Sequence, residues 1–393
     1  MKIGLFTDTY KPEINGVVTS ITLLTEGLRA LGHDVWIIAP SHPDAPADED
    51  QVIRVPSMPL VVLPERRFAT PVEKGLMKQI KDLQLDVIHT NAEFAVNSFG
   101  FRAHKRYGIP LVHTYHTVWE DYTHYVVPSA FNRPARAAVR KLSVQVCDRA
   151  DRVIAPTADT KNLLQSYGVS VPIDVIPTGV DLARFAPTDA GNSEQAAQLQ
   201  ALRKQWKLEG FSRTLLSIGR VASEKGVLEL LLELSPYLKE HPETCLLVVG
   251  DGPQRRELQR LVPSLGIEQQ VIFTGEQPWE SVPDYYRLAD VLVGNSVSET
   301  QGLTFIEAIA SGTPIIARNN DCFKGIIEDG ISGTLLEDET GFVPAIKALF
   351  EDEQFFERRV TNGFEAATHI SKEVFAEAVE QSYIDTVIST KMS

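Results

Sequence analysis

Short apolar runs rich in β-branched residues recur along the chain, and segments with helical spacing of apolar residues separate many of them. In the first half, such runs predict strands at 2–7, 34–39, 52–55, 87–90, 111–115, 152–156 and 173–177. In the second half they predict strands at 214–219, 245–250, 271–274, 291–295, 314–317 and 333–336. The predicted helices include 17–31, 72–83, 228–238, 255–261, 281–288, 304–311 and 343–349. This alternation predicts an α/β fold with mostly parallel, doubly wound sheets.

The alternation stops at residues 186–212, which contain no predicted strand and are partly helical at 196–206. A chain of 393 residues also exceeds what one core usually supports. We therefore expect Rossmann-like domains at 1–180 and 213–370, an inter-domain region at 181–212, and a C-terminal amphipathic helix at 371–393 that packs back toward the N-terminal domain. Open α/β sheets bind ligands at the carboxyl ends of their strands, so two domains facing each other would place the active site in a deep cleft.

The charge of the chain is unevenly distributed, with a net value of −14. Residues 1–180 hold 19 basic and 19 acidic residues, whereas the remainder holds 19 basic and 33 acidic residues. Residues 66–141 alone hold 12 basic and 6 acidic residues, which indicates that the first domain meets an anionic surface. The acidic total argues against a general nucleic-acid binder.

Features of exported or membrane-spanning proteins are not expected here. The sequence starts directly with a predicted strand instead of a signal peptide, and its apolar runs are shorter than the ~18–20 residues that span a bilayer. Cys147, Cys245 and Cys322 are isolated from one another and lack metal-ligand spacing. We therefore expect a cytoplasmic protein with reduced thiols and no metal site.

The segment 298–307 places Glu299 and Glu307 on either side of Gly302, with an apolar helix predicted to follow. A helix N-terminus offers unbonded N–H groups and a positive partial charge, which suit a phosphate. A diphosphate with a hydroxyl-rich ring at each end, such as a sugar nucleotide, would fit two flanking glutamates. The alternative is that the acidic residues only cap or solvate the helix.

Other candidate residues also follow predicted strands. Arg220 and Lys225 leave one strand end together, and the pair could neutralise a diphosphate or simply form ion pairs with Glu224. Gly16 precedes the first helix and is equally compatible with an anion site and an ordinary turn. The turn Gly250-Asp251-Gly252 could line a ligand, although a structural role is slightly favoured there.

The first domain has two further candidate features. His116 follows a buried strand and could donate a hydrogen bond to a sugar hydroxyl or lie near the reacting centre, although a lone histidine is more often structural. Residues 126–147 contain no acidic residue, and they place Arg133, Arg136 and Arg140 on one helix face beside Lys141. A basic amphipathic helix suits an anionic membrane, and a solvated surface helix is about equally compatible.

Together these residues resemble glycosyltransferase family 4, whose members are retaining enzymes of the GT-B fold. The matching positions are Gly16, His116, Gly219-Arg220 with Lys225-Gly226, Gly250-Asp251-Gly252, and Glu299 with Glu307. The resemblance covers nearly the whole chain, with five motifs in order. The sequence departs from many members at Thr300 and Gln301, where they have Gly and Phe, which leaves the donor sugar open.

The resemblance implies a role for each matching residue. Arg220 and Lys225 would hold the donor diphosphate, together with backbone N–H groups of Gly302 and Leu303 and with Gly16 close by. Glu307 would bind the ribose, and Glu299 the transferred sugar, which His116 would contact at its 6-position. Backbone at Gly275 and Glu276 would meet the base, and Gly250 and Asp251 would line the donor site. The departing phosphate would take the acceptor's proton, and no metal cofactor would be required.

Within the family, residues 113–125 are most similar to bacterial 1,2-diacylglycerol 3-α-glucosyltransferases. This implies a UDP-glucose donor, a diacylglycerol acceptor and peripheral attachment to the inner face of the cell membrane. The residues assigned to the acceptor or membrane side are Asp8, Tyr122, His124, Tyr125, Arg133, Arg136, Arg140 and Lys141. The alternatives are a phosphatidylinositol mannosyltransferase, a soluble-sugar glycosyltransferase, or a sugar-nucleotide 2-epimerase, which the basic stretch disfavours. A non-enzymatic nucleotide-sugar-binding protein is disfavoured because the donor residues are intact.

Overall fold

The computed structural model describes residues 1–46, 49–59, 67–70, 75–92, 94–118, 132–187, 192–296, 298–338 and 340–392. The chain divides into two compact units. Unit 1 comprises Met1–Gly179 and Lys372–Ser393, and unit 2 comprises Val180–Ser371. The sequence predicted an inter-domain region at residues 181–212. These residues belong to unit 2, because their helices pack on its core.

Unit 1 is built on a seven-stranded parallel sheet in the order β3-β2-β1-β6-β7-β8-β9. The strands are β1 (Lys2–Phe6), β2 (Asp34–Pro40), β3 (Val52–Val55), β6 (Val87–Thr90), β7 (Leu111–Thr114), β8 (Arg152–Ala155) and β9 (Ile173–Val175). Alternate side chains point to opposite faces. Leu5 thus packs with α1 (Gly16–Ala30) and α15 (Lys372–Met392), and Phe6 packs with α2 (Leu76–Leu83) and α3 (Ala95–Tyr107).

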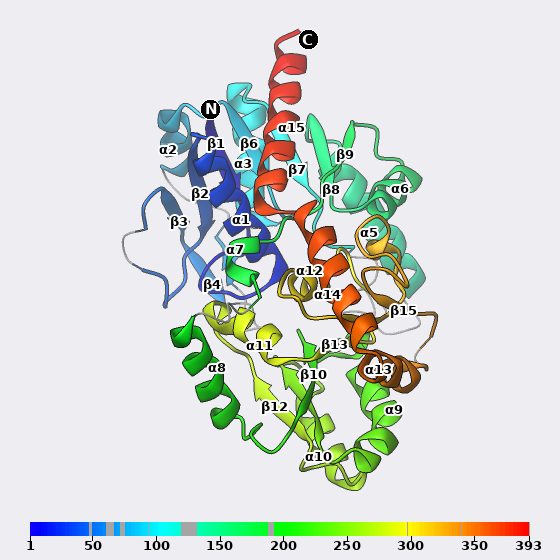
Figure 1. The fold of residues 1–393 in the computed structure, drawn as a ribbon. Helices are drawn as coiled ribbons and strands as arrows, with labels where there is room; N and C mark the ends of the chain where they lie inside the picture. Colours follow the sequence, from blue (N-terminus) through cyan, green and yellow to red (C-terminus); the bar gives the residue numbers. More distant parts are fainter. Residues whose placement is uncertain are drawn as a thin grey trace. The chain divides into compact units, whose positions relative to one another are not determined.

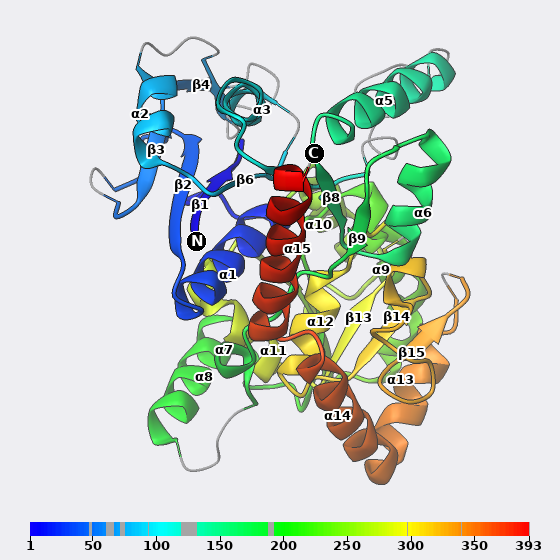
Figure 2. The same cartoon turned by 90° about the horizontal axis from the view of Figure 1, so that it is seen from above.

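The C-terminal helix α15 belongs to unit 1 and lies beside α1 (Figure 1 and Figure 2). A Cβ on Gly27 of α1 would lie 2.5 Å from the Cβ of Ala376, so the two helices approach closely there. Tyr383 of α15 reaches the sheet, where its hydroxyl lies 2.7 Å from Nδ1 of His89. The end of the chain is thereby fastened into the first core.

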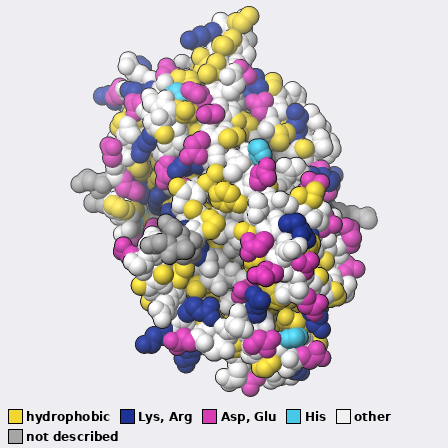
Figure 3. Space-filling view, in the orientation of Figure 1, with side chains coloured by type: hydrophobic (Ala, Val, Ile, Leu, Met, Phe, Trp, Pro, Cys, Tyr) yellow, Lys and Arg dark blue, Asp and Glu magenta, His cyan; other side chains and the backbone are white. Residues whose placement is uncertain are grey.

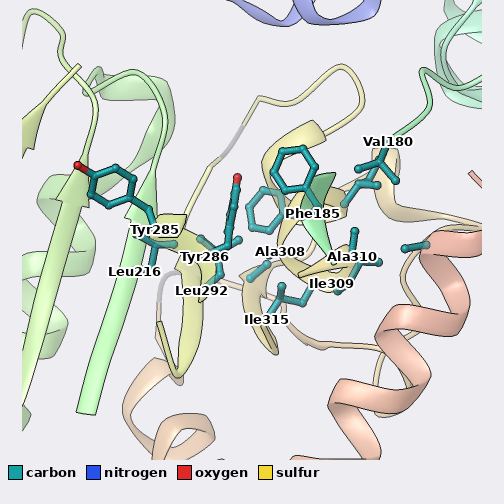
Figure 4. Packing of buried hydrophobic residues seen from close by; sticks show 14 of the residues in the cluster. Val180, Phe185, Leu216, Tyr285, Tyr286, Leu292, Ala308, Ile309, Ala310 and Ile315 are labelled. Carbon is teal, nitrogen blue, oxygen red and sulfur yellow. The ribbon is translucent and has the colours of Figure 1, made fainter. Parts of the chain in front are cut away.

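Unit 2 contains a six-stranded parallel sheet in the order β12-β11-β10-β13-β14-β15. The strands are β10 (Arg213–Ile218), β11 (Thr244–Val249), β12 (Val271–Gly275), β13 (Val291–Gly294), β14 (Ile315–Arg318) and β15 (Thr334–Leu336). Leu215 faces the core that includes α9 (Val227–Glu240), α10 (Arg255–Ser264) and α13 (Phe342–Glu351). Leu216 faces the core that includes α11 (Val282–Leu288) and α12 (Leu303–Ala310) (Figure 4). Both sheets reverse their strand order beside the first strand, so each has a switch point where α/β sheets bind ligands.

The remaining elements complete the two units. They are β4 (Ser57–Pro59) and β5 (Arg67–Ala69), which form an antiparallel pair, α5 (Asn132–Cys147), α6 (Ala158–Tyr167), α7 (Leu182–Phe185), α8 (Ser193–Gln205), α14 (Glu353–Thr368), and the 3₁₀ turns η3 (Ser223–Lys225), η4 (Trp279–Ser281) and η5 (Asp321–Phe323).

Within the part of the chain that the structure describes, the helices are too short or too polar to cross a bilayer. Hydrophobic side chains do gather at the projecting end of α15, at the top of the view in Figure 3, where Ile388 is 53% and Met392 83% exposed.

Candidate functional site

The switch point of unit 2 brings together the charged residues that follow β10 and β13. Nζ of Lys225 donates to Oε1 of Glu299 at 2.6 Å, although 74 positions separate the two residues in sequence. Both residues line a pocket with Arg220 and with residues 217–219 at the end of β10. The structure therefore assembles one cationic pair and one of the two predicted glutamates at a single place.

Arg220 makes an ion pair with its neighbour Glu224, as the structural interpretation of this segment allowed. The distance from Nη2 to Oε1 is 2.5 Å, and Glu224 is buried. The Arg220 side chain nevertheless remains 51% exposed. A guanidinium has five N–H donors, so this ion pair leaves it able to bind an anionic ligand as well.

Helix α12 begins at the predicted glycine. Gly302 is its N-cap residue and has φ of 72°, a left-handed conformation that glycine adopts without strain. In the described part of the chain, no side chain caps the first turn of α12. The amide groups that begin at Leu303 can therefore bind an anion, as the sequence predicts.

The other glycines of the motifs allow backbone segments to cross closely. A Cβ on Gly250 would lie 2.0 Å from the carbonyl oxygen of Gly219, and one on Gly226 would lie 2.3 Å from that of Asn295. Gly250 and Gly226 also have positive φ. These contacts give Gly250 and Gly226 a packing requirement that holds whether or not a ligand binds.

Asp251 and the predicted base-contacting residues have different environments. The Asp251 carboxylate accepts a hydrogen bond from its neighbour Gly252 and pairs with Arg255 at 2.7 Å. Gly275 is buried with φ of 78°, and a Cβ there would lie 2.9 Å from the Arg255 guanidinium. Glu276 is exposed. Arg255 thus ties the Gly250 turn to the end of β12.

Glu307 is not an N-cap residue, because it lies in the second turn of α12. Its Oε2 accepts a hydrogen bond from the Tyr286 hydroxyl at 2.7 Å. Burial raises the pKa of the Glu307 carboxyl to about 7, against the lowering effects of the Tyr286 hydrogen bond and the positive charge of Arg184. Tyr286 itself stays protonated, since burial raises its pKa well above 10.

Four residues that act on Glu307 or on the Lys225 loop were not identified from the sequence: Arg184, Tyr286, Asn295 and Ser296. Asn295 donates from Nδ2 to the Gly226 carbonyl oxygen at 3.3 Å, and Ser296 donates from Oγ to that of Glu224 at 3.2 Å. Both join the loop that carries Lys225 to the loop that carries Glu299. Asn295 and Ser296 follow β13 just before Glu299, and this position at the end of a strand could have identified them as site residues. No local sequence pattern indicated a role for Arg184 or Tyr286.

In unit 1, His116 is partly exposed and lies beside Asn91 at the end of β6. Nε2 of His116 is 3.0 Å from Oδ1 of Asn91, whose Nδ2 donates to the His89 carbonyl oxygen at 3.4 Å. Burial lowers the pKa of His116 to about 4, so the ring is neutral at pH 7. Because Nε2 then carries the proton, Nδ1 can only accept. In this tautomer Nδ1 can accept a hydrogen bond from a ligand hydroxyl, whereas the sequence suggested His116 as a donor.

The neighbouring histidines are structural. His89 is buried between the Tyr383 hydroxyl and the Thr114 hydroxyl, at 2.7 and 2.6 Å. His113 is fully buried, with Nδ1 2.9 Å from the Thr90 hydroxyl, and burial lowers its pKa to about 3. Both rings thus remain neutral within the core.

Asp8 and Gly16 lie at helix N-termini. The Asp8 carboxylate accepts from the backbone N–H groups of Phe94 and Val96 at 3.0 and 2.7 Å, so it caps α3. Gly16 is exposed and opens α1, where the side chain of Asn15 accepts from the next two backbone N–H groups. A phosphate at α1 would therefore have to share that turn with Asn15.

Helix α5 carries exposed basic residues. Arg136, Arg140 and Lys141 are exposed, and Leu142 is exposed as well. The helix is buried only toward its C-terminal end, at Ser143 and at residues 146–147, and it extends from unit 1 in Figure 2. The side chain of Arg133 and residues Tyr122, His124 and Tyr125 lie outside the described part of the chain.

Two Rossmann-like units in one chain, with a basic and acidic site at the switch point of the second, define the GT-B class of glycosyltransferases. The family model for Glycosyltransferase Family 4 matches residues 14–184, and that for Glycosyl transferases group 1 matches residues 199–366. The chain therefore belongs to glycosyltransferase family 4 and is, as an enzyme, a hexosyltransferase.

Two similar proteins are both alpha-monoglucosyldiacylglycerol synthases. The Streptococcus pneumoniae protein is 37% identical over 391 residues, covering 99% of this chain and 87% of its own. The Acholeplasma laidlawii protein is 31% identical over 394 residues, covering 98% of each chain. The GDP-mannose-dependent alpha-mannosyltransferase of Corynebacterium glutamicum is 26% identical over 398 residues, covering 98% of this chain and 89% of its own.

Two solved structures have the same fold. Sucrose-phosphate synthase from Thermosynechococcus elongatus superimposes with a TM-score of 0.77 at 23% identity, covering 99% of each chain. Anabaena HepE in complex with UDP-glucose gives a TM-score of 0.75 at 18% identity, covering 98% of this chain and all of the other. These likenesses confirm the predicted fold class.

Proposed function

We propose that this enzyme transfers glucose from UDP-glucose to the 3-hydroxyl of 1,2-diacylglycerol, with retention of configuration, to give alpha-monoglucosyldiacylglycerol. The observation that carries the proposal is the 37% identity to a synthase of that glycolipid over almost the whole chain. The second such synthase, at 31% identity, supports the same acceptor. The assembled charges of unit 2 support a sugar-nucleotide donor.

The donor site consists of the residues that surround the Lys225–Glu299 pair. Lys225 and Arg220 neutralise the diphosphate, and the first N–H groups of α12, from Leu303 on, bind its oxygens. Displacement of Lys225 toward the phosphate would release Glu299 to accept from hydroxyls of the glucose. Glu307 accepts from the ribose hydroxyls, and backbone at Gly275 and Glu276 meets the base.

The reaction exchanges one bond at the anomeric carbon. The bond from C1 of glucose to the β-phosphate oxygen breaks, and a bond from C1 to the acceptor oxygen forms on the same face. The proton of the acceptor hydroxyl moves to the departing phosphate, and UDP leaves. The cations at the diphosphate stabilise the negative charge that develops there, and His116 accepts from a sugar hydroxyl to orient the ring. We expect the reaction to require no metal ion.

The acceptor is a lipid, so we further propose that unit 1 docks on an anionic membrane surface. The exposed cations Arg136, Arg140 and Lys141 of α5 support this, since each basic residue near such a surface contributes about 1 kcal/mol. The exposed Leu142 lies beside them and offers an apolar contact.

The test is to incubate the enzyme with vesicles that contain diacylglycerol and with labelled UDP-glucose, GDP-mannose or GDP-glucose in parallel. The expected result is one glucolipid of the mass of monoglucosyldiacylglycerol, with an α anomeric signal by NMR. The 26% identity to a GDP-mannose-dependent enzyme makes mannose transfer the second candidate. A mannolipid, or no labelled lipid from UDP-glucose, would refute the proposal.

A further inference from the structure

Tyr286 contacts Glu307 from helix α11, which is firmly fixed in the core of unit 2. Helix α11 buries most of its residues, and Tyr286 is fully buried. The Thr313 hydroxyl donates to the Tyr286 carbonyl oxygen at 2.8 Å. The rings of Phe185 and Tyr286 pack in a T-shaped arrangement, with centroids 5.8 Å apart (Figure 4). The tyrosine hydroxyl therefore has a fixed position.

The next residue, Arg287, ties α11 to the segment that opens unit 2. Its Nη1 pairs with Asp284 at 2.9 Å, and its Nε donates to the Ala186 carbonyl oxygen at 2.9 Å. Nη2 of Arg287 also donates to the Arg184 carbonyl oxygen. The Arg184 guanidinium in turn lies over the Trp279 ring, 3.2 Å from its centroid. Arg184 and Tyr286, which approach Glu307 from α7 and α11, are thus held in one framework.

The geometry assigns Tyr286 a positioning role in donor binding: its hydroxyl holds Oε2 of Glu307, so that Oε1 is presented to the hydroxyls of the ribose. This inference rests on the proposed role of Glu307. In the described part of the chain the hydrogen bond from Tyr286 is the one that Glu307 makes through its side chain. A carboxylate held at one oxygen loses less rotamer freedom when a ligand binds the other.

The same hydroxyl influences the charge of Glu307. The carboxyl has a pKa of about 7 in the unliganded protein, and the hydrogen bond from Tyr286 and the charge of Arg184 both lower it. Ribose hydroxyls donate to the ionised form. Loss of the Tyr286 hydroxyl should therefore raise the pKa of Glu307 further and shift donor binding to higher pH.

Tyr286→Phe is the test, and the chain supplies a matched control in Tyr285→Phe. Tyr285 precedes Tyr286 on α11 and is equally buried, but its side chain points elsewhere (Figure 4). Its hydroxyl donates to Gln277 at 2.8 Å and accepts from Nε1 of Trp206 at 3.0 Å. Each variant loses one buried hydroxyl, but only Tyr286→Phe loses the contact with Glu307.

Binding of UDP-glucose and, in parallel, GDP-mannose is measured by calorimetry from pH 6 to pH 9 for the wild type, both phenylalanine variants, Glu307→Gln, and Tyr286→Phe combined with Glu307→Gln. Both probes carry a ribose and a diphosphate ester that does not titrate in this range. We expect Tyr286→Phe to bind UDP-glucose about tenfold more weakly at pH 7, with partial recovery by pH 9. In the glucolipid synthesis assay, the same variant should show a raised KM for UDP-glucose and an unchanged kcat. Tyr285→Phe should match the wild type.

The Glu307→Gln variant distinguishes an error in the proposed role of Glu307 from an error in the proposed role of Tyr286. It should weaken binding at every pH and abolish the pH dependence, and adding Tyr286→Phe should then cause no further loss. If Glu307→Gln binds like the wild type, the role of Glu307 is wrong and the role of Tyr286 falls with it. If Glu307→Gln loses binding but Tyr286→Phe behaves like Tyr285→Phe, only the role of Tyr286 is wrong.

Discussion

Glu307→Gln is expected to stabilise unit 2, increasingly as the pH rises. The wild-type carboxyl has a pKa of about 7 in the folded protein against an ordinary value of 4.5, because its charged form is poorly solvated. Between these values the folded state binds more protons than the unfolded state, so the contribution of Glu307 to stability falls as the pH rises through about 7. Glutamine has a similar shape and no charge, and it avoids this loss.

The magnitude follows from the difference in pKa. Each pKa unit corresponds to about 1.4 kcal/mol, so the shift of Glu307 from 4.5 to about 7 corresponds to roughly 3–4 kcal/mol at most. The residue is only partly buried by its overall exposure, and solvent reduces the effect, so we expect about 1–2 kcal/mol. For a unit the size of Val180–Ser371, that is a rise in Tm of roughly 2–8 °C at pH 8.

The assay is scanning calorimetry of the wild type and Glu307→Gln at intervals from pH 5 to pH 8. Glu268→Gln, an exposed residue in the same unit, provides a matched control for removal of one negative charge. The stability gain of Glu307→Gln should be small at pH 5 and grow toward pH 8, while the control stays flat. A variant less stable than the wild type at pH 8, or a gain independent of pH, would refute the assignment of a buried, proton-binding carboxyl.

Three other variants and one treatment test the remaining assignments. Lys225→Ala should weaken UDP-glucose binding by about tenfold in calorimetry, and unchanged affinity would contradict a donor site at the Glu299 pair. Gly250→Ala should destabilise the protein by about 3 kcal/mol or more in urea unfolding, because its Cβ would lie 2.0 Å from a carbonyl oxygen. The control is Gly330→Ala, which also has positive φ but open space around it, and it should destabilise the protein by only about 1 kcal/mol. Arg136→Glu with Arg140→Glu should weaken binding to anionic vesicles, measured by sedimentation, by roughly 30-fold or more while UDP-glucose affinity persists; loss of both would indicate misfolding. Glucolipid synthesis should continue in EDTA, and its loss with recovery on adding a divalent metal would show that the reaction depends on a metal.

The strands of both sheets could be predicted because a parallel sheet buried on both faces requires nearly continuous apolar runs. The prediction at 87–90 coincides with β6, and that at 214–219 is one residue out of register with β10. Helix α3 was not identified, and the reason is physical. Its N-terminus is capped by Asp8, 86 residues earlier in the chain, so no local capping pattern marks where it begins.

The site was predictable in part for the same reason. Arg220, Lys225 and Glu299 follow strands, and parallel strands end at one edge of a sheet, so strand prediction alone brings them near one another. Their individual partners were not predictable. Lys225 forms an ion pair with Glu299 and not with the adjacent Glu224, which instead pairs with Arg220. The hydroxyl of Tyr286 reaches Glu307 only because two helices pack on the same face of the sheet.

The environment of Glu307 differs from that of a glutamate that only caps or solvates a helix. A capping or solvated glutamate would lie in the first turn or point to water, where it would stabilise the helix by a few tenths of a kcal/mol to about 1 kcal/mol. Glu307 lies in the second turn, turned toward a buried tyrosine, and its ionisation costs stability at neutral pH. The Tyr286 hydrogen bond and the Arg184 charge offset this cost only in part. This position fits the proposed contact with the ribose, because hydroxyls that donate to the ionised carboxylate would offset the cost of burying its charge.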